Sequence, residues 1–159
     1  MGRKSIKENK NIYQQRREEL GLTREQAAEL LEYISDDRIA KIESGKTLPR
    51  AEEVLTMAKA YKEPGLCNFF CTHECEIGQK YIPKAEEKDL AQITVEMLAE
   101  INDLNQEKER LIEIAVDGVI DQSEREDFQK IHERLNEMSR SIASLQIWIE
   151  GALQTGKIK

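Results

Sequence analysis

Two long stripes of mainly apolar residues in the second half of the sequence restrict the fold most strongly. Within each stripe, residues recur at alternating spacings of four and three. This spacing places side chains on one face of an α-helix, here for about four heptads. The first stripe contains Leu90, Thr94, Met97, Ile101, Leu104, Lys108, Leu111 and Ala115, and the second contains Phe128, Ile131, Leu135, Met138, Ile142, Leu145, Ile149 and Ala152. Two long helices are therefore predicted.

The segment between the stripes, VDGVIDQSERE, carries turn signals. Gly118 is predicted to end the first helix, and Ser123 with Glu126 forms a capping-box pattern that would begin the second. Because a short turn connects them, the helices are expected to fold back antiparallel. The result is a coiled-coil-like hairpin whose helices each span roughly 40 Å, at about 1.5 Å per residue.

Shorter helices with clear cap signals are expected before this hairpin, over residues 12–20, 24–32, 36–44 and 51–61. Thr23 with Gln26 makes a capping box, Ser35 is an N-cap, and Gly21 and Gly45 follow helix ends. The prediction is an all-α protein in three parts. They are a four- to five-helix N-terminal domain in residues 1–65, a cysteine-bearing connector in residues 66–85, and the helical hairpin in residues 86–159.

Composition and charge limit the compartment and the partners. The sequence is 35% charged, 39% hydrophobic and 5% aromatic, which suits a soluble, helix-rich protein. The first ten residues hold no apolar signal region, and no apolar run approaches the roughly 18 residues of a membrane span. These features favour a cytoplasmic location and no membrane partner. Residues 1–62 contain 13 Lys and Arg against 11 Asp and Glu, whereas residues 63–159 contain 11 against 20, which favours two modules with different partners.

The stretch RREELGLTREQAAELLEYISDDRIAKIESGKTLPRAEEVLTMAKAY resembles the XRE, or lambda-repressor-like, family of bacterial helix-turn-helix regulators. The resemblance covers residues 12–62 and is carried by REELGLT, by IESGK, and by the proline and apolar helix that follow. It implies a DNA-binding transcription regulator in which Arg17 pairs with Glu43 to tie the first helix to the recognition helix. The turn LEYIS departs from the family pattern, because it is one residue longer and lacks the usual glycine.

The resemblance also implies which residues meet double-stranded DNA. Thr23 and Arg24 begin the second helix, where the family contacts phosphate. Asp36, Asp37 and Lys41 match its base-reading positions, and Lys46 and Arg50 lie in the loop that would reach the backbone. Ser35 and Arg38 complete the predicted DNA-binding set. A basic arm supports it, because the first 17 residues hold six Lys and Arg and a single acid, Glu8.

Two aspartates at the start of a recognition helix allow two interpretations. Asp36 and Asp37 can complement the free N–H groups and dipole of the helix, which stabilises it by about 0.3–1 kcal/mol each. Alternatively, one of them accepts a hydrogen bond from a cytosine amino group in the major groove. In both cases the carboxylates reduce nonspecific affinity, so weaker and more selective DNA binding is expected than in a basic relative.

A cluster of potential metal ligands follows, in LCNFFCTHECEIG. Cys67, Cys71, His73 and Cys75 have side chains that zinc prefers, but their spacing matches no common zinc finger. On an unbroken helix the three sulfurs would not converge, so a metal site requires the helix to break near His73. The alternatives are a buried helix face, since free cysteines are often buried, and a redox sensor. No cofactor other than this possible zinc is expected.

The sequence therefore favours a non-enzymatic regulator that binds DNA as a homodimer. Apolar residues outside the two stripes would need cover, and a second copy would supply it by forming a four-helix bundle. These residues are Leu98, Ile112, Ile114, Ile147 and Trp148. The alternative is that they pack on the rest of the same chain. A rival function is a protein-interaction adaptor that no longer reads DNA, with a protein partner on the hairpin.

Overall fold

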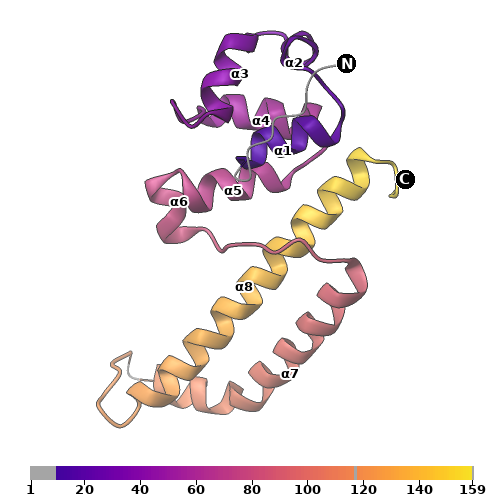
Figure 1. The fold of residues 1–159 in the computed structure, drawn as a ribbon. Helices are drawn as coiled ribbons and strands as arrows, with labels where there is room; N and C mark the ends of the chain where they lie inside the picture. Colours follow the sequence, from indigo (N-terminus) through magenta and orange to yellow (C-terminus); the bar gives the residue numbers. More distant parts are fainter. Residues whose placement is uncertain (1–9, 117, 159) are drawn as a thin grey trace. The chain divides into compact units, whose positions relative to one another are not determined.

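The computed structural model describes residues 10–116 and 118–158, and all the regular structure in them is helical. The all-α prediction is confirmed. The helices are α1 (Ile12–Glu19), α2 (Arg24–Leu31), α3 (Asp36–Glu43), α4 (Ala51–Ala60), α5 (Gly65–His73), α6 (Glu76–Tyr81), α7 (Leu90–Ala115) and α8 (Arg125–Gln154) (Figure 1). None of these helices combines the length and apolar character needed to cross a bilayer.

The helices form two compact units. The first contains the described residues up to Ile82 and those from Glu150 onward, and the second is Pro83–Ile149. Most of α8 therefore lies in the second unit, while its last residues belong to the first.

Side-chain caps start the short helices of the first unit where the sequence predicts them. Thr23 and Gln26 form the capping box of α2, with the Gln26 N–H donating to Thr23 Oγ1 at 3.2 Å and the Thr23 N–H donating to Gln26 Oε1 at 2.9 Å. Ser35 caps α3 by accepting from the Arg38 N–H, also at 3.2 Å. These caps satisfy N–H groups that a helix start leaves unpaired, so local sequence places the start of both helices.

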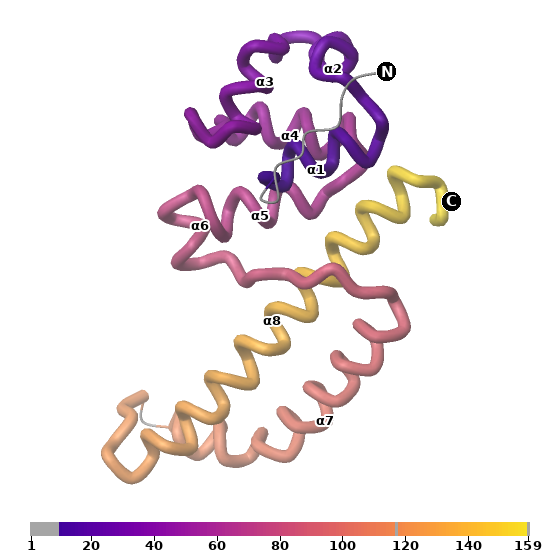
Figure 2. The backbone as a smooth tube through the Cα atoms, viewed as in Figure 1, coloured from indigo at the N-terminus to yellow at the C-terminus, as the bar shows by residue number. Residues whose placement is uncertain are grey.

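The core of the first unit draws on every helix from α1 to α5, whose backbone Figure 2 traces. Its buried apolar residues are Tyr13, Ala27, Leu31, Ile34, Ile39, Ile42, Val54, Met57, Ala58, Tyr61 and Leu66. The segment expected to be a connector, residues 66–85, contains α5 and α6. Cys67, Phe69 and Phe70 of α5 pack against the core, and α5 itself contacts α4 and α6.

The turn between α2 and α3 is tight and strained at one residue. Glu32 has φ 59° and ψ −59°, and the Tyr33 N–H donates to the Leu31 carbonyl at 2.7 Å, which closes a three-residue γ-turn. Non-glycine residues rarely adopt positive φ. The glycine missing from LEYIS therefore leaves Glu32 in a conformation that glycine would adopt more easily.

In the second unit, α7 and α8 run antiparallel and pack together (Figure 1). Polar bonds join them along their length: Ser141 Oγ donates to Glu100 at 2.7 Å, and Arg134 Nε donates to Glu107 at 2.9 Å. Arg134 also pairs with Asp103, and Arg110 Nε donates to Asp127 at 2.8 Å. The predicted hairpin is confirmed as this helical pair.

The cap before α8 differs from the one predicted. Asp121, rather than Ser123, accepts from the N–H groups of Ser123 and Glu124, at 2.7 and 3.1 Å. Glu124, rather than Glu126, accepts from the Asp121 N–H at 3.2 Å. The reciprocal cap therefore lies two residues earlier than the Ser123–Glu126 pattern, because a carboxylate accepts two N–H bonds at once.

The buried seam between α7 and α8 follows the predicted stripes only in part. Met97, Leu104, Leu111, Phe128, Ile131, Met138, Leu145 and Ala152 are buried or half-buried, as predicted. The prediction was wrong for Leu90, Thr94, Ile101, Lys108, Ala115, Leu135, Ile142 and Ile149, which are exposed. Except at Leu90, the residue one position earlier is buried or half-buried instead: Ile93, Glu100, Glu107, Ile114, Arg134, Ser141 and Trp148. The polar bonds across the seam account for this rotation, because they hold Glu100, Glu107, Arg134 and Ser141 inside it.

Candidate nucleic-acid interface

The predicted ion pair between Arg17 and Glu43 is present and buried. Arg17 Nε and Nη2 donate to the two carboxylate oxygens of Glu43 at 2.5 and 2.9 Å, and Arg17 Nη1 donates to the Leu22 carbonyl at 2.6 Å. The hydrogen bonds to Glu43 raise the pKa of Arg17 above its ordinary value. The pair fastens α1 to the end of α3 and also holds the chain that leads into α2.

Arg24, predicted to contact phosphate, shares the same carboxylate. Its Nε donates to Glu43 Oε2 at 2.8 Å while the side chain stays partly exposed. Thr23, just before it, uses its hydroxyl oxygen as the cap acceptor of α2. Both residues lie at the start of α2, where a phosphate would meet free N–H groups, but Arg24 must give up one ion pair to reach it.

The outward side of α3 carries the predicted base-reading residues. Asp36, Asp37 and Lys41 are exposed, whereas Ile39 and Ile42 point into the core. Lys41 Nζ donates to Asp37 Oδ2 at 2.6 Å. This bond lowers the pKa of Asp37 below its ordinary value. In this structure, therefore, a cation and an anion among the predicted base-reading residues neutralise each other.

Arg38 is directed away from this surface. Its guanidinium donates to both oxygens of Glu53, at 2.7 and 2.6 Å, to Thr47 Oγ1 at 2.6 Å and to the Leu48 carbonyl at 3.0 Å. The hydrogen bonds from Arg38 lower the pKa of the Glu53 carboxyl. The structure thus places Arg38 as a brace between α3, the following loop and α4.

Two further predicted cations remain accessible in the loop after α3. Lys46 and Arg50 are exposed, and Arg50 is 3.7 Å from Glu52, a distance typical of a weak surface ion pair. Within the described residues, the Lys46 side chain makes no ion pair or hydrogen bond. Three cations of the predicted basic arm, Arg3, Lys4 and Lys7, lie outside the described residues. The other three, Lys10, Arg16 and Arg17, all pair with glutamates of the fold.

This arrangement of α2 and α3 can be compared with known proteins. A family model described as a helix-turn-helix domain matches residues 14–66, about a third of the chain. Residues 14–66 form a helix-turn-helix domain. Domains of this kind bind DNA with the second of the two helices in the major groove. No curated protein and no solved structure matches the chain.

The helix-turn-helix domain also exposes apolar side chains that the sequence analysis did not single out. Tyr33 and Leu55 are 62% and 63% exposed. The Tyr33 hydroxyl donates to the Glu52 carbonyl at 3.1 Å and bonds to Thr56 Oγ1, which holds the ring over α4. Large exposed side chains of this type are common in contacts between proteins. Periodicity does not identify them, because Leu55 keeps the helical spacing of the buried Val54, Ala58 and Tyr61, and Tyr33 lies in the turn after α2.

The structure does not bring the predicted metal ligands together. Cys67 and Cys71 lie one turn apart on α5, and burial raises the pKa of the Cys67 thiol. The His73 ring stacks on Phe69 with centroids 4.3 Å apart, and Cys75 caps α6. Among the described residues, no group of three or more His, Cys, Asp or Glu side chains is arranged to hold a metal ion. The helix does end at His73, as a metal site requires, but the side chains serve packing and capping.

A partly buried polar pair beside these cysteines was not predicted. The Tyr13 hydroxyl donates to Glu74 Oε2 at 2.8 Å, which joins α1 to the end of α5. Burial raises the pKa of both the phenol and the carboxyl, so both groups favour their neutral forms. The pair connects the cysteine-bearing helix to the helix-turn-helix domain, and no local sequence pattern signals such a contact.

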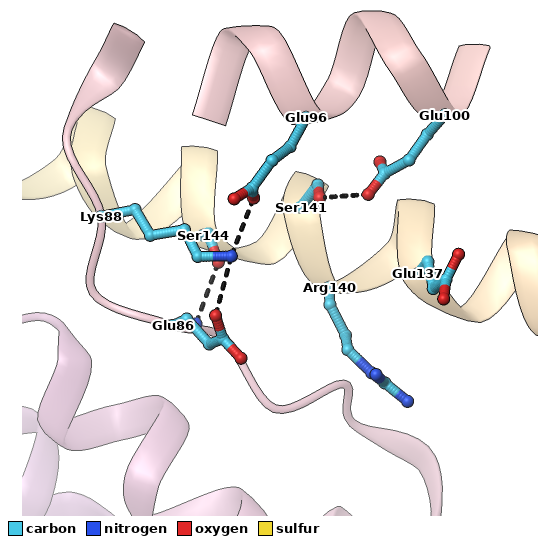
Figure 3. A pocket seen from close by; sticks show the side chains of 8 residues that line it. All are labelled: Glu86, Lys88, Glu96, Glu100, Glu137, Arg140, Ser141 and Ser144. Atoms are coloured by element: carbon cyan, nitrogen blue, oxygen red, sulfur yellow. Dashed lines mark hydrogen bonds and ion pairs between the residues drawn. The ribbon is translucent and has the colours of Figure 1, made fainter. Parts of the chain in front are cut away.

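The hairpin has a polar hollow on one side (Figure 3). It encloses about 230 Å³ between the chain before α7 and the facing sides of α7 and α8. Lys88 bridges Glu86 and Glu96, each at 2.7 Å, and the Glu86 N–H donates to Ser144 Oγ at 3.0 Å. Figure 3 shows Lys88 between the two carboxylates. These charges satisfy one another, so the hollow fastens residues 83–89 to the hairpin.

Proposed function

We propose that the protein is a sequence-specific, DNA-binding transcription regulator of the XRE type that acts as a homodimer and has no enzymatic role. The observation that carries the proposal is the exposed side of α3. Asp36, Asp37 and Lys41 point outward from a helix that the buried Arg17–Glu43 pair holds in place within a helix-turn-helix domain.

In the proposed complex, phosphate contacts surround the base-reading residues. Lys46 and Arg50 reach the backbone from the loop after α3, while Thr23, the first N–H groups of α2 and Arg24 reach it from the other side. Ser35 fixes the start of α3, and Arg38 holds the loop that carries Lys46. Asp36 or Asp37 accepts from a cytosine amino group, and Lys41 donates to a guanine.

Charge pairing makes this binding selective rather than strong. Arg24 and Lys41 already have carboxylate partners, so they gain less from DNA than free cations would. About three phosphate contacts per domain predict a slope near −2.7 for log affinity against log salt, and about twice that for a dimer. A strongly basic domain would give a steeper slope.

The test measures binding to duplexes selected from a random pool. Lys46→Ala and Arg50→Ala should weaken binding to all sequences and flatten the salt dependence, because each removes a phosphate contact. Lys41→Ala should instead change the preferred sequence. Lys59→Ala is the matched control, since it removes an exposed cation from α4 and should leave affinity and preference unchanged. Failure of the wild type to bind any selected duplex at low salt would reject the proposal.

One observation favours a second function, that of a protein-interaction adaptor. Arg24, Arg38 and Lys41 all pair with carboxylates of the same chain, and Tyr33 and Leu55 are largely exposed nearby on α2–α4. A surface of this kind suits a protein partner better than a polyanion. The same experiment separates the two functions, because an adaptor would bind no duplex at low salt.

A further inference from the structure

One side of the hairpin is apolar and exposed. Each of its apolar residues directly follows a residue of the buried seam: Leu98, Ile101 and Ile112 on α7, and Leu135, Ile142 and Ile149 on α8. We call these six residues the apolar face. Leu98 is 61% exposed and Ile112 is 58% exposed, so the hairpin by itself leaves much of their surface in water.

The six residues lie on the same side of the hairpin. A step of one residue turns a side chain by about 100° around the helix axis. In an antiparallel pair, the chain of α8 runs opposite to that of α7, and α8 also faces its partner helix in the opposite direction. These two reversals cancel, so a residue that follows the seam on α7 and one that follows it on α8 point toward the same side of the hairpin.

Charge divides the hairpin into two unlike sides. The positions that follow the seam hold one charged residue, Lys108, one histidine, His132, and five uncharged polar residues, Thr94, Asn105, Gln129, Ser139 and Gln146. The positions that precede the seam hold Glu96, Asp103, Arg110, Glu113, Asp127, Lys130, Glu133, Glu137 and Arg140. Residues 83–89 attach to this charged side through Lys88 and Glu86, as Figure 3 shows. The chain segment that could cover the hairpin therefore lies on the side away from the apolar face.

We propose that the apolar face is the contact surface for a second copy of this chain, which forms a symmetric four-helix bundle. Ser141 bonds to Glu100 and Arg134 bonds to Glu107, so Ile149 on α8 lies level with about residue 92 of α7. The six residues therefore extend from that level to Ile112, about 30 Å at about 1.5 Å per residue, and two helices of about 10 Å diameter make the face about 20 Å wide. The product, roughly 600 Å², is comparable to the roughly 800 Å² that each partner buries in a standard interface. A two-fold pair buries the six apolar side chains of one copy against those of the other, and the long Lys108 side chain can reach water at the rim.

Net charge argues against a lipid surface as the occupant. Residues 83–149 contain 8 Lys and Arg against 16 Asp and Glu, so an anionic membrane would repel the hairpin. The same charge opposes a second copy, but salt screens that repulsion over about 8–10 Å. The dimer should therefore tighten as salt increases, whereas DNA binding weakens.

This inference rests on the proposed function only in giving the dimer a role in DNA binding, and its test needs no DNA. The mass of the full chain is measured by light scattering and sedimentation at concentrations from about 1 to 50 µM, a range that covers the dissociation constants of many protein interfaces. The wild type should show twice the 18.4 kDa chain mass. Ile142→Glu and, on the other helix, Leu98→Lys should each raise the dimer dissociation constant more than tenfold, with helical circular dichroism unchanged because both side chains are exposed.

Val95→Glu is the matched control, because Val95 is exposed on α7 at a position that does not follow the seam. It should leave the dimer intact. The proposal is overturned by a monomeric wild type at 50 µM, by a dimer that survives both Ile142→Glu and Leu98→Lys, or by a dimer that dissociates as salt increases. A monomeric wild type would also reject the homodimer in the proposed function, whereas none of these results bears on whether the helix-turn-helix domain binds DNA.

Discussion

Glu43 links three helices of the helix-turn-helix domain through its carboxylate. Its buried carboxylate accepts from Arg17 and Arg24, and Arg17 is buried as well. We expect Glu43→Ala to lower the free energy of unfolding by about 3–5 kcal/mol, because it leaves the Arg17 cation buried without a counter-charge. Urea unfolding measures the loss. Glu52→Ala, which breaks an exposed ion pair, should cost less than about 1 kcal/mol, and equal losses in both variants would contradict this account.

The bond between Arg38 and Glu53 should make stability depend on pH. Arg38 lowers the pKa of the Glu53 carboxyl in the folded state. A lowered pKa contributes stability above the unfolded value, near 4.3, and this contribution is lost as the pH falls through the folded value. Glu53→Gln should therefore be less stable than the wild type at pH 7, with a difference that shrinks below about pH 4. In an Arg38→Ala background the difference should largely vanish at every pH.

Replacing Glu32 with glycine should stabilise the helix-turn-helix domain. Its positive φ is unfavourable for any residue with a Cβ, and such strain costs about 1–3 kcal/mol. Glu32→Gly should raise the melting temperature by a few degrees, even after the entropic cost of glycine, about 0.5–1 kcal/mol. The control is Glu29→Gly, an exposed position inside α2, which should lower the melting temperature. A decrease in both variants would show that the turn is unstrained.

At the scale of elements, the crossing of α5 and α6 depends on Gly78. A Cβ built on Gly78 would lie 2.7 Å from the carbonyl carbon of Cys71, and the atoms it meets belong to the backbone. The two helices would have to move apart, so Gly78→Ala should destabilise the first unit by about 1–3 kcal/mol or more. Gly65→Ala is the control, because its Cβ would meet only the flexible Glu63 side chain. Thermal unfolding followed by circular dichroism should separate the two variants.

The long helices show how polar bonds decide which face of a helix is buried. Arg134 pairs with Glu107 and Asp103, and Ser141 bonds to Glu100. Polar groups placed inside a helix seam favour one register over others. Here they draw residues of low hydrophobicity into the seam and leave leucines and isoleucines one position later in water. Although α7 and α8 have the most regular apolar pattern in the sequence, that pattern alone does not predict which face of each helix is buried.

At the scale of the whole molecule, DNA reading and dimerisation should be coupled. Two helix-turn-helix domains held in one dimer read two half-sites, about 34 Å or one DNA turn apart. The wild type should bind a duplex with two correctly spaced half-sites much more tightly than one with a single half-site. In Ile142→Glu this advantage should disappear, while affinity for a single half-site stays unchanged. An advantage that survives in that variant would mean that the dimer forms elsewhere.

The sequence by itself determined what local interactions control. Thr23, Gln26 and Ser35 set the starts of α2 and α3, because a cap needs only neighbours three residues away. Heptad spacing determined that residues 90–115 and 125–154 are long helices, and the motif at residues 12–62 located the helix-turn-helix domain and the Arg17–Glu43 pair.

Only the tertiary structure decided how side chains distant in the sequence share their charges and surfaces. Arg24, Arg38 and Lys41 look like free cations in the sequence, but carboxylates from neighbouring turns and helices engage them. The four predicted metal ligands stay apart because packing and capping use them separately. Six large apolar side chains of the hairpin are exposed because bonds between α7 and α8, up to 41 residues apart in the chain, hold the residues just before some of them in the seam instead. Periodicity indicates which residues share a helix face, but contacts with the neighbouring helix determine which face is buried.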